Sequence, residues 1–135
     1  MFRKLLHDDA GASAVQFAFV APILILMTLG IIDMGRLGLA ATAMRNGAIE
    51  AARYASLRGA ASPTPATLPA IVAVAKDQAV GVPPDDLSVS VAWSPDNKSG
   101  SQVRVQLSYT FSPFIAALIP LPDIPLARSS AMVVF

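Results

Sequence analysis

The stretch GASAVQFAFVAPILILMTLGIIDMGR, Gly11 to Arg36, decides the fold of this chain. No charged residue occurs between Ala10 and Ile32, a run of 23 residues. The hydrocarbon core of a bilayer is crossed by about 20 helical residues, so an apolar run of this length can span it. We therefore expect a membrane-spanning helix over residues 12–32.

The composition of the whole chain narrows the class of protein. Of its 135 residues, 54% are hydrophobic and 14% are charged, a balance typical of membrane or assembly proteins rather than free soluble enzymes. The net charge of +1 argues against a nucleic-acid partner, because phosphate binding needs clustered lysine and arginine. Without cysteine the chain has no disulfides and no thiolate chemistry, and its redox compartment stays open.

A cleaved secretory signal peptide is one alternative to a membrane helix. Such a signal has an apolar run of about 7–15 residues followed by a small-residue cleavage site. Here the small residues AGASA, from Ala10 to Ala14, precede the apolar run, and the run is longer. We favour a retained membrane helix over a signal peptide or the buried helix of a soluble protein.

The charges around the span bear on its orientation. Arg3 and Lys4 precede it, whereas Arg36 and Arg45 follow it, so the positive-inside count is nearly balanced. Long tails are translocated with little regard to local charge. We therefore expect the N-terminus in the cytoplasm and the tail after Asp33 outside it.

The span contains regularly spaced small residues and several residues that weaken a helix. Ala10, Ala14 and Ala18 recur every four residues and would let another helix approach closely in lipid. Pro22 removes one helical hydrogen bond, and glycines follow it, so local bending or melting is expected. These glycines are Gly30, Gly35 and Gly38. Alternatively, proline and glycine are simply common in membrane helices.

Beyond the span, the spacing of apolar residues predicts that the helix continues from Asp33 to Leu57. The residues that keep the 3–4 spacing are Leu37, Ala41, Met44, Ala48, Ala51, Ala52 and Ala55. Joined to the span from Ala14 onward, this gives one helix of 44 residues, roughly 66 Å at 1.5 Å per residue. Gly59 is the expected C-cap, and a proline-rich connector follows over residues 61–69.

The remaining residues predict a short helix and a small sheet. A helix is expected from Leu68 to Val80, with Thr67 as N-cap and Gly81 at its end. Alternating apolar residues predict strands over 87–93 and 103–111, and a third strand over about 126–135. The expected fold class is α+β, with the long helix covering one face of an antiparallel sheet of about three strands.

Few side chains suggest chemistry. His7 is the only histidine of the chain, and with Asp8 and Asp9 it is better explained as solvated polar sequence than as a metal site. Asp85 and Asp86 are adjacent, so in an extended chain they point apart and do not form a catalytic pair. The group Asp96, Asn97 and Ser99 is explained by turn formation rather than by cation binding.

No motif for catalysis or phosphate binding occurs, so we expect no catalytic, metal or cofactor site and no small-molecule substrate. The aromatic residues Trp93, Tyr109 and Phe111 are expected in the core, with an aromatic binding platform as the alternative. Glu50 and Arg53 are expected to form a surface ion pair.

The apolar, proline-rich segment FSPFIAALIPLPDIP, Phe111 to Pro125, leaves two alternatives open. Its prolines break it too often for a strand of that length. Either it folds back over the sheet edge or it offers an exposed apolar patch to a partner.

The order of parts at the N-terminus resembles the TadE-like pseudopilins of the tight-adherence (Flp-type) pilus system. The resemblance rests on a short charged leader ending in Gly11, then ASAVQF, an apolar helix with an early proline and the exit GIIDMGR. It runs on through RNGAIEAARYAS, Arg45 to Ser56, and the strand-rich part. It implies a type IV pilin-like fold.

The resemblance also implies processing. In that family a prepilin peptidase cuts after a glycine like Gly11, which would leave Ala12 as the new N-terminus. The family usually has glutamate where this chain has Gln16, and often tyrosine or phenylalanine at the place of Phe17. In pilins that glutamate is thought to meet the N-terminal amine of a neighbouring subunit, and Gln16 offers only neutral hydrogen bonds instead.

Together these expectations divide the chain into a leader (1–11), a transmembrane helix (12–32), a periplasmic continuation of the helix (33–60) and a small α+β head (61–135). The expected function is that of a pilin-like component of a Tad/Flp-type pilus in the bacterial inner membrane. Its expected partners are the membrane, the prepilin peptidase and other pilin-like or pilus assembly proteins. The alternative is a membrane-tethered binding or sensory module unrelated to pili.

Overall fold

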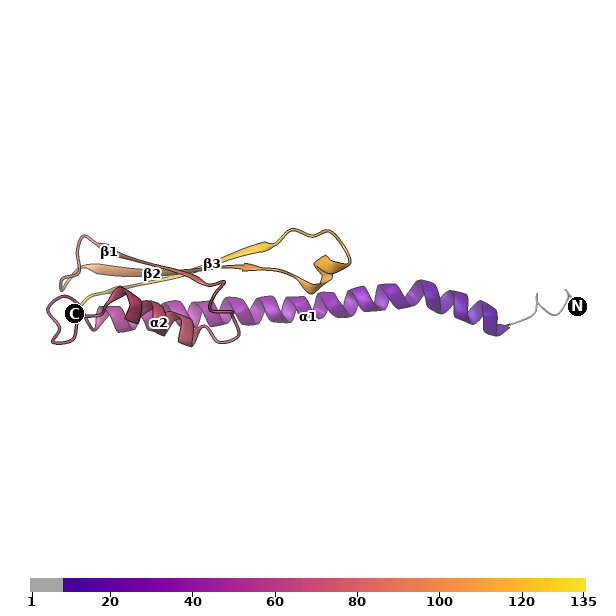
Figure 1. Ribbon diagram of the computed structural model, residues 1–135, viewed down its shortest axis with the longest axis horizontal. Helices are drawn as coiled ribbons and strands as arrows, with labels where there is room; N and C mark the ends of the chain where they lie inside the picture. The colour runs from indigo at the N-terminus through magenta and orange to yellow at the C-terminus, as the bar shows by residue number, and fades with distance from the viewer. Residues whose placement is uncertain (1–8) are drawn as a thin grey trace, which may run out of the picture.

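The computed structural model describes residues 9–135 and consists of one long helix with a small head packed along its C-terminal half (Figure 1). The elements are α1 (Asp9–Ser56), α2 (Leu68–Gln78), β1 (Ser88–Ser94), β2 (Gln102–Phe111), the short 3₁₀ helix η2 (Phe114–Ala117) and β3 (Ile124–Val133). The α+β fold is confirmed. His7 and Asp8, like most of the expected leader, lie outside the described residues.

Helix α1 is continuous over 48 residues, with Pro22 inside it. Of the bending or melting expected after Pro22, melting does not occur at the glycines, since Gly30, Gly35 and Gly38 are all helical. Figure 1 shows instead a gentle bend in the N-terminal third of α1. The apolar part of α1 has a mean hydropathy of 2.4 in its most apolar window, none of which is buried, so this helix is long and apolar enough to span a membrane.

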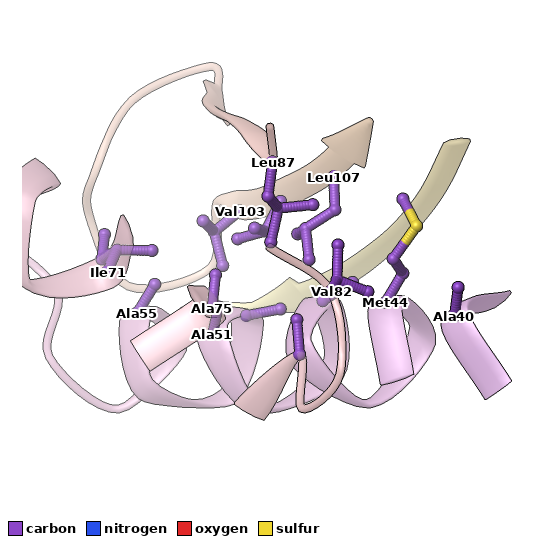
Figure 2. Close-up of a cluster of buried hydrophobic side chains, with 14 of the residues drawn as sticks. Ala40, Met44, Ala51, Ala55, Ile71, Ala75, Val82, Leu87, Val103 and Leu107 are labelled. Atoms are coloured by element: carbon purple, nitrogen blue, oxygen red, sulfur yellow. The ribbon is translucent and has the colours of Figure 1, made fainter. Parts of the chain in front are cut away.

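The C-terminal half of α1 forms the core through its small residues (Figure 2). Met44 is fully buried, and the alanines around it on the same face are at most 6% exposed. These alanines are Ala40, Ala48, Ala51, Ala52 and Ala55. Leu37 and Ala41, which were expected on this face, are only half-buried, because the buried face runs through Ala40 instead.

Helix α2 crosses α1 at a glycine. A Cβ added at Gly47 would lie 2.6 Å from the carbonyl oxygen of Ala75 in α2 and 3.1 Å from the side chain of Leu107 in β2. Thr67 caps α2, as expected, by accepting a hydrogen bond from the N–H of Ala70 at 3.4 Å. The helix ends at Gln78, two residues earlier than expected, and Gly81 then adopts a φ of 87°.

The sheet has the order β1-β2-β3, and both pairs are antiparallel. Central strand β2 supplies Val103, Val105 and Leu107 to the core, each with no exposed surface. Val105 pairs with Val91 of β1 and with Ser130 of β3. The strand alternation predicted from the sequence is confirmed, although the inward side chains of β1 are only half-buried.

Gly59 does not cap α1, so that expectation is wrong. The helix ends at Ser56, and among the described glycines only Gly81 and Gly100 have a positive φ. Close packing explains the glycine instead, because a Cβ at Gly59 would clash with the side chain of Val134. The C-terminus is held beside it, where the N–H of Phe135 donates to the carbonyl of Ser56 at 3.0 Å.

The crossing at Gly47 generates a prediction. Replacing a helical glycine by alanine normally stabilises a helix by about 0.5–1 kcal/mol. Gly47→Ala should instead lower the free energy of unfolding by about 1–3 kcal/mol, because the new methyl group meets the backbone of α2. The measurement is denaturant unfolding of the full chain in detergent micelles, followed by circular dichroism.

Gly38→Ala is the matched control, because a Cβ at Gly38 has no atom within 4 Å in the same helix. It should stabilise the chain or leave it unchanged. Equal stabilisation by both substitutions would show that α2 does not approach α1 as closely as described.

Candidate functional site

The N-terminal half of α1 presents its side chains outward. Its exposed large apolar side chains are Val15, Phe17, Phe19, Val20, Ile23, Leu24, Ile25, Met27, Ile31, Ile32 and Met34. Ala14, Ala18 and Pro22 follow one another along one side of the helix, because residues four apart differ by about 40° around its axis. Gln16 lies on nearly the opposite side from Ala14. The residues expected to pack against another helix therefore lie on a different side of α1 from Gln16.

Gly11 and Ala12 lie in the first turns of α1 and are exposed. The first four N–H groups of a helix have no partner within it, so little hydrogen bonding is lost when the first turn opens. The two residues are thus accessible, but an extended conformation at this point requires local unwinding.

Asp33, the first charged residue after the apolar run, is buried and joins α1 to a distant segment. Its Oδ1 accepts a hydrogen bond from the N–H of Phe114 at 2.9 Å, and its Oδ2 accepts one from the N–H of Ile115 at 2.9 Å. These partners are 81 and 82 residues away in the chain. Only 6% of Asp33 is exposed, so the carboxylate is satisfied almost entirely by the protein.

Arg36 completes this junction from the next turn of α1. Its guanidinium lies 3.0 Å from Oδ1 of Asp33 and forms an ion pair with it. The same group stacks on the ring of Phe114, 3.8 Å from its centroid, and lies 5.0 Å from that of Phe111. Arg36 therefore contacts both the carboxylate and the aromatic side chains at the end of β2 and just after it.

The environment of Asp33 shifts its ionisation. Burial raises the pKa of Asp33, but the hydrogen bonds from Ile115, Phe114 and Arg36 lower it by more, so the pKa lies below its ordinary value of 3.8. Asp33 is therefore an anion at neutral pH, as the ion pair with Arg36 requires.

The segment Ser112–Asp123, termed here the α1-proximal loop, is neither a strand nor a cover for the sheet edge. It folds back onto α1, where η2 contacts the helix (Figure 1). The expectation that the segment folds back over the sheet edge is therefore wrong. It folds onto α1 instead, because the carboxylate of Asp33 accepts hydrogen bonds from the loop. Several apolar side chains of the loop remain exposed, namely Phe114, Leu118, Ile119 and Leu121.

The other candidate residues form no site. Asp85 and Asp86 are exposed turn residues. Asp96 accepts a hydrogen bond from the hydroxyl of Ser101 at 2.6 Å and one from the N–H of Lys98 at 3.1 Å, and these bonds hold its pKa below the ordinary value. Within residues 9–135 no group of three His, Cys, Asp or Glu side chains could hold a metal ion.

The aromatic and paired residues lie mostly as expected. Phe111 is buried, whereas Trp93 and Tyr109 are half-buried on the inner face of the sheet. Glu50 and Arg53 form an exposed ion pair at 3.6 Å. An open groove of ≈ 630 Å³ lies between α1, the end of α2 and β2, lined in part by Arg36 and Tyr109.

Sequence reasoning missed the junction between Asp33 and the α1-proximal loop. The available signal was an aspartate at the end of an apolar span together with a charge-free proline-rich segment elsewhere in the chain. Nothing in either segment alone specifies that they meet.

The junction predicts a pH response. Because the pKa of Asp33 is lowered on folding, its ionised form stabilises the junction above the ordinary pKa, and this contribution is lost as the pH falls through the lowered value. The amide resonances of Phe114 and Ile115 should therefore titrate together in acid, with a midpoint below 3.8. The measurement is NMR of the labelled full chain in micelles.

Asp33→Asn is the control, since the amide keeps an acceptor oxygen but does not titrate there. Both titrations should disappear in this variant. Amides that stay unchanged in the native chain from neutral to strongly acidic pH, or that titrate equally in the variant, would contradict the junction.

Comparison with known proteins bears on the same part of the chain. Residues 11–53 match the family model described as "TadE-like protein", which covers most of α1, including Asp33 and Arg36. Searches of curated proteins and of solved structures found no match. The resemblance seen in the sequence is therefore confirmed over residues 11–53, and this part of the chain is TadE-like.

Proposed function

We propose that this protein is a pilin-like component of a Tad/Flp-type pilus that acts in pilus assembly or initiation. It contributes through helix packing in the membrane and contacts of its head, without catalysis of its own. The observation that carries the proposal is the TadE-like match over residues 11–53, which falls on a helix whose apolar part is exposed along its length. A helix of this kind has to bury that surface in lipid or against other helices.

The proposed arrangement is a single pass through the bacterial inner membrane. Residues 12–32 span the bilayer, residues 33–60 continue the helix outside the cytoplasm, and residues 61–135 form the head. Support comes from length, because 21 helical residues extend about 30 Å, the thickness of the hydrocarbon core. The small residues Ala14 and Ala18, followed by Pro22 on the same side, are the proposed face for packing against another helix.

Processing is the sharpest test of this proposal. We expect the mature protein in its native host to lack residues 1–11 and to begin at Ala12, after cleavage by a prepilin peptidase. The exposed first turns of α1 support access to this bond. The measurement is the intact mass of membrane-extracted protein from cells with the peptidase and from cells without it.

Gly11→Val is the matched variant, because a β-branched side chain cannot be held as closely as glycine in a protease cleft. It should accumulate as the uncut chain. Recovery of the full-length native chain alone, while the peptidase is active, would contradict the processing proposal.

Gln16 distinguishes an accessory subunit from a repeating filament subunit. A glutamate in lipid is tolerated when it is paired, as with the amine of a neighbouring subunit, whereas an unpaired charge costs about 2.5–3.5 kcal/mol at the centre of a span. Gln16 is exposed on α1, on the side away from the proposed packing stripe. As an accessory subunit, the protein does not depend on a charge at this position.

We therefore expect Gln16→Ala to reduce pilus number only modestly and Gln16→Glu to reduce it more, through lower insertion or stability. Pilus number per cell and steady-state protein level would be measured for both variants in the native strain. If the glutamate variant equalled the native protein while the alanine variant made no pili, the protein would be a filament subunit that uses this contact.

A further inference from the structure

We infer that the α1-proximal loop, Ser112–Asp123, is a second membrane contact that lies in the bilayer interface beside the end of the span. The inference rests on the proposed membrane insertion of residues 12–32 and adds a surface that lies outside the TadE-like match. Its occupant is the lipid bilayer.

The position of the loop along α1 is the first observation. The carboxylate of Asp33 binds two consecutive N–H groups of the loop, so the start of η2 is fixed at the level of the residue that follows the span. One turn earlier, Leu29 and Gly30 are half-buried, whereas Ile31 and Ile32 are exposed. Figure 1 shows the loop lying alongside α1 at the end of the head nearest the N-terminus. A bilayer that contains residues 12–32 therefore reaches the loop as well.

The side chains of the loop suit that location. From Ser112 to Pro122 the loop has no charged residue. Phe114 is 54% exposed, Leu118 58% and Leu121 44%, and together with Ile119 they continue the exposed apolar surface of the span. In water such a surface would be costly, while lipid stabilises it. Arg36 lies over the Phe114 ring, where a long cationic side chain can reach the headgroups.

The backbone of the loop is also suited to a medium poor in water. Five of its N–H groups have acceptors: those of Phe114 and Ile115 in Asp33, and those of Ala116, Leu118 and Ile119 within the loop. Three further positions are prolines, which have no N–H. These are Pro113, Pro120 and Pro122. Unsatisfied backbone groups are costly in lipid, so this arrangement lowers the penalty that the N–H groups of an irregular segment would carry at the membrane.

The test uses the absence of cysteine, which allows a single spin label at any chosen position of the full chain. Leu118→Cys and Leu121→Cys place labels on the loop, and both side chains are exposed enough to be replaced without disturbing the core. Leu57→Cys is the matched control, since Leu57 is 61% exposed and directly follows the C-terminal end of α1. Ile25→Cys, at an exposed position in the span, reports on insertion itself.

The labelled chains are reconstituted into vesicles of phosphatidylcholine and phosphatidylglycerol. Accessibility to oxygen, which concentrates in lipid, is compared with accessibility to a water-soluble nickel chelate by electron paramagnetic resonance. The ratio of oxygen to nickel accessibility at Leu118 and Leu121 should be several-fold higher than at Leu57 and lower than at Ile25.

Three results would overturn the inference. Loop labels as accessible to nickel as Leu57, with Ile25 in lipid, would place the loop in water while leaving the membrane anchor intact. Loop labels shielded from both reagents and broadened by neighbouring labels would show that a second copy of the chain covers the loop. A label at Ile25 accessible to nickel would instead contradict the membrane anchor itself, and the loop contact with it.

Discussion

The head of this protein depends on the close approach of α2 and the sheet to the small-residue face of α1. Alanine at positions such as Ala48, Ala51 and Ala52 brings the neighbouring elements almost to the backbone of the helix, and Gly47 allows direct contact with α2. Such packing buries little apolar area per residue, but it defines the distance between α1 and the elements packed on it. Since α1 is one continuous helix, this packing also fixes the head relative to the apolar half of α1.

Asp33 marks the change between the two halves of α1. Before it, the large apolar side chains are mostly exposed; after it, the buried face consists of alanines around Met44. A buried carboxylate at this point would be unfavourable without partners. The N–H groups of Phe114 and Ile115 and the guanidinium of Arg36 supply them, and as a result the α1-proximal loop is held at the same level.

Periodicity in the sequence was sufficient to predict α1, α2 and the three strands, because each has a periodic apolar pattern within its own segment, and α2 also has its cap, Thr67. It was not sufficient for features that depend on two distant segments. The junction at Asp33, the clash that keeps Gly59 a glycine and the choice of Ala40 over Ala41 for the core all depend on what packs opposite. Four candidate site residues were predicted from the family resemblance and not from periodicity: Gly11, Ala12, Gln16 and Phe17. All four are exposed on α1, so packing within the chain does not explain their identity.

The direction of the strands has a mechanical consequence. The strands run along α1 rather than across it (Figure 1), and the hydrogen bonds of an antiparallel ladder are perpendicular to the strands. When a load on the sheet pulls against a helix held in the membrane, the tension is parallel to the strands. The ladder bonds between β2 and its neighbours are then strained together, in shear, instead of being peeled apart one at a time. The head thus resists traction along the axis of α1 better than a force applied across it.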